Sequence, residues 1–330
     1  MSEPRHDVLA VGNAIVDVLT HADDAFLARH GMAKGVMTLI DSARADELYA
    51  AMGAGVGCSG GSAANTAAVV ASLGGRPVFV GKVRDDELGR TFAHDIEAAG
   101  VAFPCRPAEN GTATARCLIF VTPDAQRTMN TFLGACRELA PADIDDSLVE
   151  SAAVTYLEGY LWDLPEAKAA MRKACAAAHR AGRKVAFSLS DPFCVGRHRD
   201  EFRDLVKSEV DILLANEDEA LALSETTRLD DALEAIRPHV AAAAVTRGAR
   251  GCVAIAGGTT AMVPADAAVR VTDTTGAGDA FAAGFLYALT RGAALSACAR
   301  LGNMAAARII AHFGARPERP MTDLYPSATA

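Results

Sequence analysis

The residues best suited to chemistry lie in the stretch DTTGAGDAFAAGF, residues 273–285. Gly276, Ala277 and Gly278 come directly before an acid, Asp279, and a run of helix-forming apolar residues follows. A helix that begins at such a turn presents unpaired backbone N–H groups and the positive end of its dipole, and both favour a bound anion. Asp279 is therefore either an acid that stabilises the start of a helix, or a catalytic acid beside an anion site.

A second pair of polar residues, Asn216 and Glu219, follows the apolar run VDILLA. Residues three apart share one face of a helix, so an amide and a carboxylate would lie together there. Such a pair suits a hydrated Mg²⁺ ion, which keeps most of its water ligands. The alternative is structural, because an N-cap asparagine and a glutamate three residues later form a capping box.

Strands and helices must bring these residues together. Residues 7–11 are a short apolar run that ends at Gly12–Asn13, which predicts a buried strand and a turn. Residues 60–75 begin and end with glycines around good helix formers, which predicts a buried helix. From about residue 150 onward, apolar strands alternate with helices. This alternation predicts an α/β fold with a mainly parallel sheet, helices on both faces, and ligands at the carboxyl ends of the strands.

Two segments of the N-terminal half do not fit this alternation. Residues 14–40 are typical of short strands and turns, and residues 112–134 of a hairpin around Pro123–Asp124. We expect them to pair into a small inserted sheet. This sheet would cover a ligand as a lid, or its exposed edges would pair with a second chain, so a monomer and a lid-mediated homodimer both remain open.

Composition excludes several classes of protein. The net charge of −9 argues against a nucleic-acid partner, which requires a basic face. We expect no membrane association, because no run of about 20 apolar residues occurs. The N-terminal residues lack the pattern of a signal peptide, and none of the eight cysteines stands in CxxC spacing. We therefore expect a cytoplasmic protein with reduced thiols.

The two glycine-rich stretches together resemble the signatures of the ribokinase-like, or PfkB, family of carbohydrate and nucleoside kinases. DTTGAGDAFAAGF matches the C-terminal signature and GGSAANTAAVVASLGG the N-terminal one, and the resemblance runs from VGNAIVD to GARP. It implies one three-layer α/β/α domain over residues 1–330, with a lid formed by insertions at about 14–40 and 108–132. It also implies ATP and Mg²⁺. Arg84 stands where the family often has glycine, and its role is left open.

Within this family the chain is most similar to adenosine kinases, in GNAIVDVL, LEGYLWD, SLSDPFCVGRHRDEF, ANEDEA and LGNMAAARIIAHFGARP. The resemblance implies phosphorylation of the 5′-hydroxyl of adenosine to AMP, a step of purine salvage. The alternatives are a sugar kinase of the ribose or fructose type, an inosine or guanosine kinase, and a non-catalytic nucleoside-binding module. A dinucleotide-binding oxidoreductase is discounted, because no GxGxxG motif follows the first strand.

The family match assigns roles to single residues. Asp279 matches the catalytic base, and the backbone of Gly276, Ala277 and Gly278 would hold the transferred phosphate. The dipole of the helix should keep the pKa of Asp279 low. The expected substrate-binding residues are Asn13, Asp17, Gly60, Gly61 and Asn65 around the ribose, with Ile15, Leu133, Tyr160 and Trp162 around the base. Val36 and Met37 are further candidates for the base, although core positions suit these two better.

The resemblance also implies nucleotide and cation sites. The residues expected near ATP are Asn216, Thr246, Arg247, Gly248, Gly251 and Asn303, and Glu219 would hold Mg²⁺ through water. A possible K⁺ site would use Asp273 and Thr275 with backbone carbonyls near Ile309, His312 and Gly314. For Asp17 and Asn303, the alternatives are a solvated turn acid and an ordinary amide on a helix face.

Overall fold

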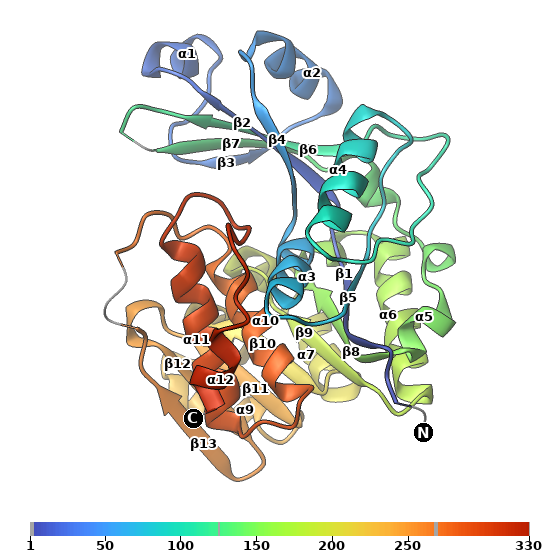
Figure 1. Cartoon of the computed structure of the whole chain (residues 1–330), viewed down its shortest axis with the longest axis vertical. Helices are drawn as coiled ribbons and strands as arrows, with labels where there is room; N and C mark the ends of the chain where they lie inside the picture. Colours follow the sequence, from blue (N-terminus) through green and yellow to red (C-terminus); the bar gives the residue numbers. More distant parts are fainter. Residues whose placement is uncertain (1–2, 125, 267–269, 330) are drawn as a thin grey trace.

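The computed structural model describes residues 3–124, 126–266 and 270–329 (Figure 1). It contains a large sheet and a smaller second sheet. The large sheet has the strand order β13-β12-β11-β10-β9-β8-β1-β5. Its strands are β1 (His6–Val11), β5 (Pro77–Val80), β8 (Ala152–Glu158), β9 (Lys184–Ser188), β10 (Ile212–Asn216), β11 (Ala242–Thr246), β12 (Cys252–Ala256) and β13 (Thr259–Val263).

The large sheet is parallel from β5 to β11, and only the β11–β12 and β12–β13 pairs are antiparallel. Successive residues of β1 pack on opposite faces: Val8 belongs to one hydrophobic core and Leu9 to the other. The mainly parallel sheet and its two cores confirm the predicted α/β class.

Helices cover both faces of the large sheet. One core contains α3 (Ser62–Ser72), α10 (Ala277–Leu289), α11 (Leu295–Ile310) and α12 (Leu324–Thr329). The other contains α5 (Asp146–Glu150), α6 (Pro165–Arg180), α7 (Pro192–Ser208), α8 (Glu217–Ser224) and α9 (Leu229–Ile236). Short 3₁₀ turns complete this part: η1 (Gly134–Glu138), η2 (Pro141–Asp143), η3 (Gly159–Asp163) and η4 (Gly248–Arg250). The buried helix predicted in residues 60–75 is α3.

The second sheet has the order β3-β7-β6-β2-β4 and lies above the large sheet in Figure 1. Its strands are β2 (Ile15–His21), β3 (Met37–Leu39), β4 (Val56–Gly60), β6 (Ala115–Val121) and β7 (Arg127–Phe132), and α1 (Asp24–Arg29), α2 (Ser42–Ala51) and α4 (Glu87–Ala98) accompany it. β6 and β7 form the predicted hairpin.

Two features of the second sheet differ from the sequence prediction. Residues 14–40 contain the helix α1, which has only six residues and one buried side chain, Leu27, too few to give a hydrophobic period. β4 was not predicted either, because its sequence VGCSG has low strand propensity and its pairing with β2 is long-range. The second sheet therefore draws its strands from residues 15–60 as well as from the hairpin.

Three smaller features complete the fold. All eight cysteines are free, as predicted. In the described part of the chain, no helix is long and apolar enough to cross a bilayer. Arg84, whose role the sequence left open, lies between β5 and α4, where its Nη1 donates to the Gly111 carbonyl and its backbone N–H donates to Thr114 Oγ1 at 3.0 Å. It holds the segment that leads into β6.

Candidate active site

A cavity of about 390 Å³ lies at the carboxyl ends of the large sheet, where α10 begins; we call it the α10 cavity. Its walls come from the end of β10, the loop between β9 and α7, and the turn before α10. The residues lining it include Ser62, Tyr160, Ser190, Asn216, Glu219, Thr246, Gly276, Ala277, Gly278 and Asp279. The predicted base, phosphate turn and Asn216–Glu219 pair therefore meet in one place.

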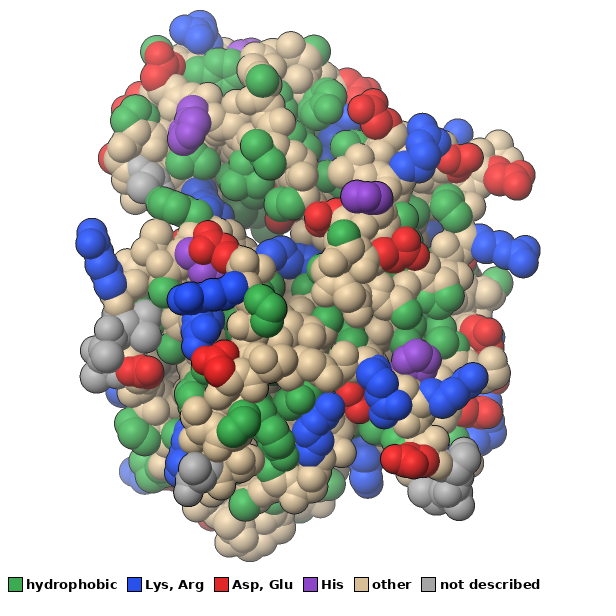
Figure 2. All heavy atoms as spheres, viewed as in Figure 1, with side chains coloured by type: hydrophobic (Ala, Val, Ile, Leu, Met, Phe, Trp, Pro, Cys, Tyr) green, Lys and Arg blue, Asp and Glu red, His purple; other side chains and the backbone are tan. Residues whose placement is uncertain are grey.

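A second cavity, of about 360 Å³, lies between η3 and the second sheet; we call it the η3 cavity. In the space-filling view the surface is indented between the part that carries the second sheet and the rest of the molecule (Figure 2). The lining includes Asn13, Leu39, Ile40, Phe132, Leu133, Tyr160, Leu161, Asp163 and Leu164. Tyr160 lines both cavities, so the two are neighbours across its side chain.

Asp279 is held by two side chains of α3. Its Oδ1 accepts a hydrogen bond from Ser62 Oγ at 2.7 Å, and its Oδ2 accepts one from Asn65 Nδ2 at 3.0 Å. Removal of water around the carboxylate raises the pKa of Asp279, and these hydrogen bonds only partly offset this effect. The expectation of a low pKa, made from the helix dipole, is therefore wrong, because desolvation outweighs the dipole.

The turn before Asp279 offers uncapped backbone donors. Gly276 is the N-cap of α10, has φ +76°, and makes no side-chain capping bond. In the described residues, the N–H groups of Gly278 and Asp279 have no backbone acceptor outside the helix. A Cβ at Gly278 would have no heavy atom within 4 Å, so the space over this turn is open. Open space and uncapped donors fit an anion such as a phosphate.

Asn216 and Glu219 form the reciprocal capping box that was the structural alternative for this pair. Asn216 Oδ1 accepts from the Glu219 N–H at 2.8 Å, and Glu219 Oε2 accepts from the Asn216 N–H at 2.9 Å. Burial raises the pKa of Glu219 to about 7. Because Glu219 also lines the α10 cavity, capping and binding of a hydrated cation are compatible roles.

The predicted ribose residues gather around the start of α3. Gly61, the N-cap of α3, has φ +97°, and any Cβ there would overlap the Asn13 carbonyl oxygen. A Cβ at Gly60 would lie 2.5 Å from Asp17 Oδ2. Burial raises the pKa of Asp17 to about 6, against the charges of Arg316 and Arg127. Asn65 Oδ1 is buried without a partner among the described residues, so an acceptor is available to a ligand hydroxyl.

Glu158 is a candidate site residue that sequence analysis missed. It is fully buried at the end of β8. Its Oε1 accepts from both the N–H and Nδ2 of Asn13 at 2.8 Å, and its Oε2 accepts from the Ala63 N–H at 2.8 Å. Burial raises the pKa of Glu158 to about 7, despite these three donors. The sequence did contain a signal, because an acid that ends an apolar strand is unusual inside a core.

Arg316 was also missed. Its Nε donates to the Ser59 carbonyl at 3.1 Å, whereas Nη1 and Nη2 are buried without partners in the described chain. Its charge acts on both Asp17 and Asp279. A buried guanidinium with unused donors beside these carboxylates suits an anionic group of a ligand.

The predicted K⁺ ligands cluster, but Asp273 already has a cationic partner. Asp273 Oδ2 lies 2.7 Å from Arg127 Nη2 and accepts from the Gly314 N–H at 2.9 Å, and Oδ1 accepts from Thr275 Oγ1 at 2.7 Å. The Ile309 carbonyl accepts from the His312 N–H at 3.3 Å. A K⁺ site here stays a prediction. Arg127, on β7, had not been predicted to reach this turn.

Several predicted residues lie elsewhere. Trp162 is not in either cavity lining; it is fully buried against Phe187 and Phe202, and its size and apolar neighbours explain the position. Val36 and Met37 are neither core nor cavity residues, since they are 47% and 50% exposed near the edge strand β3. Ile15, Arg247, Gly248, Gly251 and Asn303 are outside the two linings, and so are four of the five predicted ribose residues, Asp17, Gly60, Gly61 and Asn65.

Asn303 instead donates to the carbonyls of Val263 and Pro264, at 3.1 and 3.0 Å. Arg247 lies 3.5 Å from Glu217 through its Nε, and its backbone N–H donates to the Gly251 carbonyl at 2.7 Å. These contacts keep Arg247 and Gly251 at the β11–β12 turn, next to Thr246. Their predicted part in ATP binding stays a prediction.

Comparisons with known proteins agree with this architecture. The model of the pfkB family of carbohydrate kinases matches residues 38–321. The solved structure of an adenosine kinase from Sinorhizobium meliloti is 50% identical, covers 98% of this chain and 99% of its own, and has a TM-score of 0.89. A probable sugar kinase from Rhizobium etli CFN 42 is 47% identical, with 98% and 99% covered and a TM-score of 0.90.

A more distant relative, the adenosine kinase of Saccharomyces cerevisiae, is 27% identical over 93% of this chain and 95% of its own length. The family match and the names of these relatives support transfer of a phosphoryl group to an alcohol, with a nucleoside or sugar and ATP as substrates. The chain therefore belongs to the PfkB family of kinases, as an adenosine kinase or a sugar kinase.

Proposed function

We propose that this chain is an ATP-dependent kinase that phosphorylates the 5′-hydroxyl group of adenosine and forms AMP. The observation that carries the proposal is the η3 cavity, which adjoins the α10 cavity across Tyr160. A simple sugar needs only the region around the candidate base, whereas a nucleoside needs apolar room beside it. Leu39, Leu133 and Leu161 supply such walls. The 50% identity to the Sinorhizobium meliloti adenosine kinase supports the same choice.

In this proposal Asp279 is the general base. Its carboxylate takes the proton of the attacking hydroxyl as the new oxygen–phosphorus bond forms. Ser62 and Asn65 each hold one carboxylate oxygen, so the acceptor points in a fixed direction. The raised pKa makes this carboxylate a stronger base than an exposed aspartate. A loose transition state for phosphoryl transfer does not require early removal of the proton.

The ribose would lie against Asn13, Asp17, Gly60, Gly61 and Asn65. Glycines at 60 and 61 leave the backbone accessible. Asp17 and Asn65 Oδ1, which has no partner in the described part of the chain, can accept hydrogen bonds from hydroxyl groups. Glu158 acts through Asn13, which it fixes by two hydrogen bonds. The second sheet would close over this ligand as a lid.

Within the predicted turn of Gly276, Ala277 and Gly278, the Ala277 N–H already donates to the Thr274 carbonyl at 3.2 Å, so the N–H groups of Gly278 and Asp279 would stabilise the charge on the transferred phosphate. When bound, ATP supplies the phosphoryl group and Mg²⁺ neutralises part of its charge. Glu219 would orient a hydrated Mg²⁺, with Asn216 beside it. Thr246, Arg247, Gly248, Gly251 and Asn303 are the remaining residues proposed for the nucleotide.

The test is a kinase assay with ATP and Mg²⁺ on adenosine, inosine, guanosine, ribose and fructose. We expect adenosine to have the highest kcat/KM. Adenosine should also raise the melting temperature by mass action, since it binds only the folded state. A higher kcat/KM with ribose or fructose would contradict the proposal and favour the sugar-kinase alternative, to which the similarity to the Rhizobium etli protein points.

A further inference from the structure

The 3₁₀ turn η3 presents a carboxylate to the η3 cavity. Side chains three residues apart in a 3₁₀ turn lie above one another, so Tyr160 and Asp163 project on the same side. Both line the cavity. Three residues at a rise of about 2 Å each separate them by about 6 Å along the turn. Because Tyr160 adjoins the α10 cavity, Asp163 lies farther from the reaction centre.

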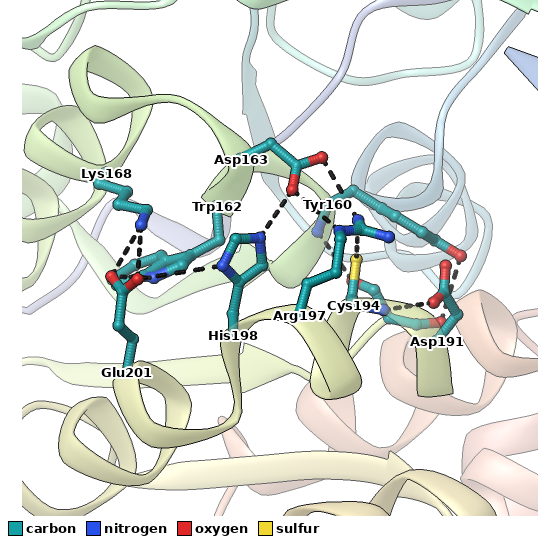
Figure 3. A network of polar contacts seen from close by, with 10 residues as sticks. Tyr160, Trp162, Asp163, Lys168, Asp191, Cys194, Arg197, His198 and Glu201 are labelled. Atoms are coloured by element: carbon teal, nitrogen blue, oxygen red, sulfur yellow. Dashed lines mark hydrogen bonds and ion pairs between the residues drawn. The ribbon is translucent and has the colours of Figure 1, made fainter.

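Asp163 is fixed by two residues of α7 (Figure 3). Its Oδ1 accepts from His198 Nε2 at 2.6 Å and from Arg197 Nε at 3.2 Å, and its Oδ2 accepts from Arg197 Nη2 at 3.3 Å. The backbone of α7 departs from helical geometry at His198, with φ −124° and ψ 20°. The same helix carries Glu201, which accepts from Trp162 Nε1 at 2.9 Å.

The other end of η3 is held by a strained residue. Ser190 has φ +72°, a conformation that serine rarely adopts. Its carbonyl accepts from the Tyr160 hydroxyl at 3.2 Å, and its Oγ accepts from the Tyr160 N–H at 3.3 Å. Backbone strain of this kind persists where the surrounding structure requires it, often beside ligands. Both ends of η3 are therefore positioned from the segment that follows β9.

Asp163 stays ionised and keeps one acceptor site. Desolvation favours the neutral form, but the hydrogen bond from His198 and the charge of Arg197 prevail and lower the pKa of Asp163. A carboxylate has about four acceptor sites, and the contacts above use two on Oδ1 and one on Oδ2. The side chain is 45% exposed, so a ligand can reach the remaining site on Oδ2.

We propose that Asp163 accepts a hydrogen bond from the 6-amino group of the purine base and thereby selects amino-purine over oxo-purine nucleosides. This inference rests on the proposed nucleoside kinase function. A nucleoside whose 5′-hydroxyl faces Asp279 extends its base away from the reaction centre, toward the end of the η3 cavity where Asp163 lies. An ionised carboxylate only accepts hydrogen bonds. It therefore suits the amino group of adenosine and repels the 6-oxo group of inosine and guanosine.

The competing explanation is that Asp163 only fastens η3 to α7. Such a role would affect stability and every substrate alike, whereas a contact to the base changes the preference between substrates. Arg137 is the other charged candidate to contact a base here, since it lines the same cavity and donates rather than accepts. Asp41 also lines it, but its side chain caps α2 by accepting from the Arg44 N–H at 2.8 Å.

The test compares kcat/KM for adenosine, inosine and purine riboside, which lacks the 6-substituent. With the wild-type chain we expect a loss of at least tenfold for purine riboside and more for inosine, chiefly through KM. Asp163→Asn should reduce the ratio of adenosine to inosine at least tenfold, because the amide can also donate to the oxo group. Asp146→Asn, which neutralises an acid paired with Arg180 outside both cavities, is the matched control and should leave the ratio unchanged.

Three results would overturn the inference. One is an unchanged ratio in Asp163→Asn, whatever its melting temperature. Another is a variant Arg137→Gln that loses the preference for adenosine over inosine while Asp163→Asn keeps it. The third is equal kcat/KM for adenosine and purine riboside with the wild-type chain. This measurement does not depend on the folding of any variant. Wild-type protein that phosphorylates no nucleoside would instead refute the proposed function, and the inference with it.

Discussion

Replacing Glu158 by glutamine should make the stability of the protein less dependent on pH. Glu158 is fully buried, and its pKa in the folded protein is raised to about 7 from an ordinary value of 4.5. Between these two values the unfolded chain has lost the proton of Glu158 and the folded chain still holds it. The free energy of unfolding therefore falls as the pH rises through this window, and it levels off above about pH 7.

The size of the effect follows from the shift in pKa. A difference of about 2.5 units corresponds to about 3 kcal/mol, which the wild-type protein loses between about pH 4.5 and pH 7. Glutamine cannot ionise, so the variant escapes this loss. The variant is destabilised by a constant amount at every pH, because an amide NH₂ group in place of Glu158 Oε2 cannot accept the hydrogen bond from the Ala63 N–H. Asp17 and Glu219 titrate in a similar range but are present in both proteins, so their contributions cancel in the difference.

The assay is urea unfolding of both proteins at several values between pH 4 and pH 8. The free-energy difference between Glu158→Gln and wild type should shift in favour of the variant by about 3 kcal/mol across this range. A difference that is constant with pH would show that Glu158 has no raised pKa, and the account of its burial would be wrong. The KM for adenosine should rise in the variant, because an amide holds the Asn13 N–H and Nδ2 less firmly than the Glu158 carboxyl group does.

Three further predictions concern other parts of the site. Asp279→Asn should fold and bind both substrates but lose about 10²–10⁴ in kcat, as expected for loss of a general base; a kcat within a few-fold of wild type would make Asp279 only a cap. Gly61→Ala should destabilise the protein by more than about 1 kcal/mol, because a Cβ at Gly61 would overlap the Asn13 carbonyl oxygen at φ +97°. Gly196→Ala, inside α7 with no heavy atom within 4 Å of the new Cβ, should be neutral or stabilising, and equal urea midpoints for the two variants would contradict this. Arg127→Gln should cost about 3 kcal/mol of stability, because it leaves the nearly buried carboxylate of Asp273 without its cation, and a change below about 0.5 kcal/mol would refute a structural role for the pair.

The parts of this protein that were predictable depend on local sequence. The glycine turn before Asp279 and the pair Asn216–Glu219 follow from capping chemistry over a few residues, and both lie in the α10 cavity. The alternation of apolar strands and helices is also a local pattern, and it predicted the mainly parallel large sheet. The start of α3 at two glycines was also predicted from the sequence, and the structure explains it because only glycine fits at position 61.

The parts that were missed depend on contacts between distant residues. Glu158 reaches Asn13 across 145 positions, and Arg127 of β7 meets Asp273, which lies far from it in the sequence, before the start of α10. Trp162 was expected at the base because the family resemblance implies that the edge of the nucleoside pocket lies just past the end of the strand before it. Its direction is set instead by Phe187 and Phe202, which belong to other elements of the core. No local pattern encodes such pairings.

The ion pair between Arg127 and Asp273 connects two segments that each continue into the lining of one cavity. Arg127 begins β7, whose last residue, Phe132, lines the η3 cavity, and Asp273 directly precedes the turn that opens the α10 cavity. A ligand in one cavity that stabilises the Arg127–Asp273 ion pair would also stabilise the form of the protein that binds a ligand in the other cavity. Thermodynamic linkage requires the effect of each ligand on the affinity for the other to be equal. Through this pair, the two substrates would raise one another's affinity by the same factor. Their dissociation constants would then be coupled quantities, each defined only at a stated concentration of the other substrate.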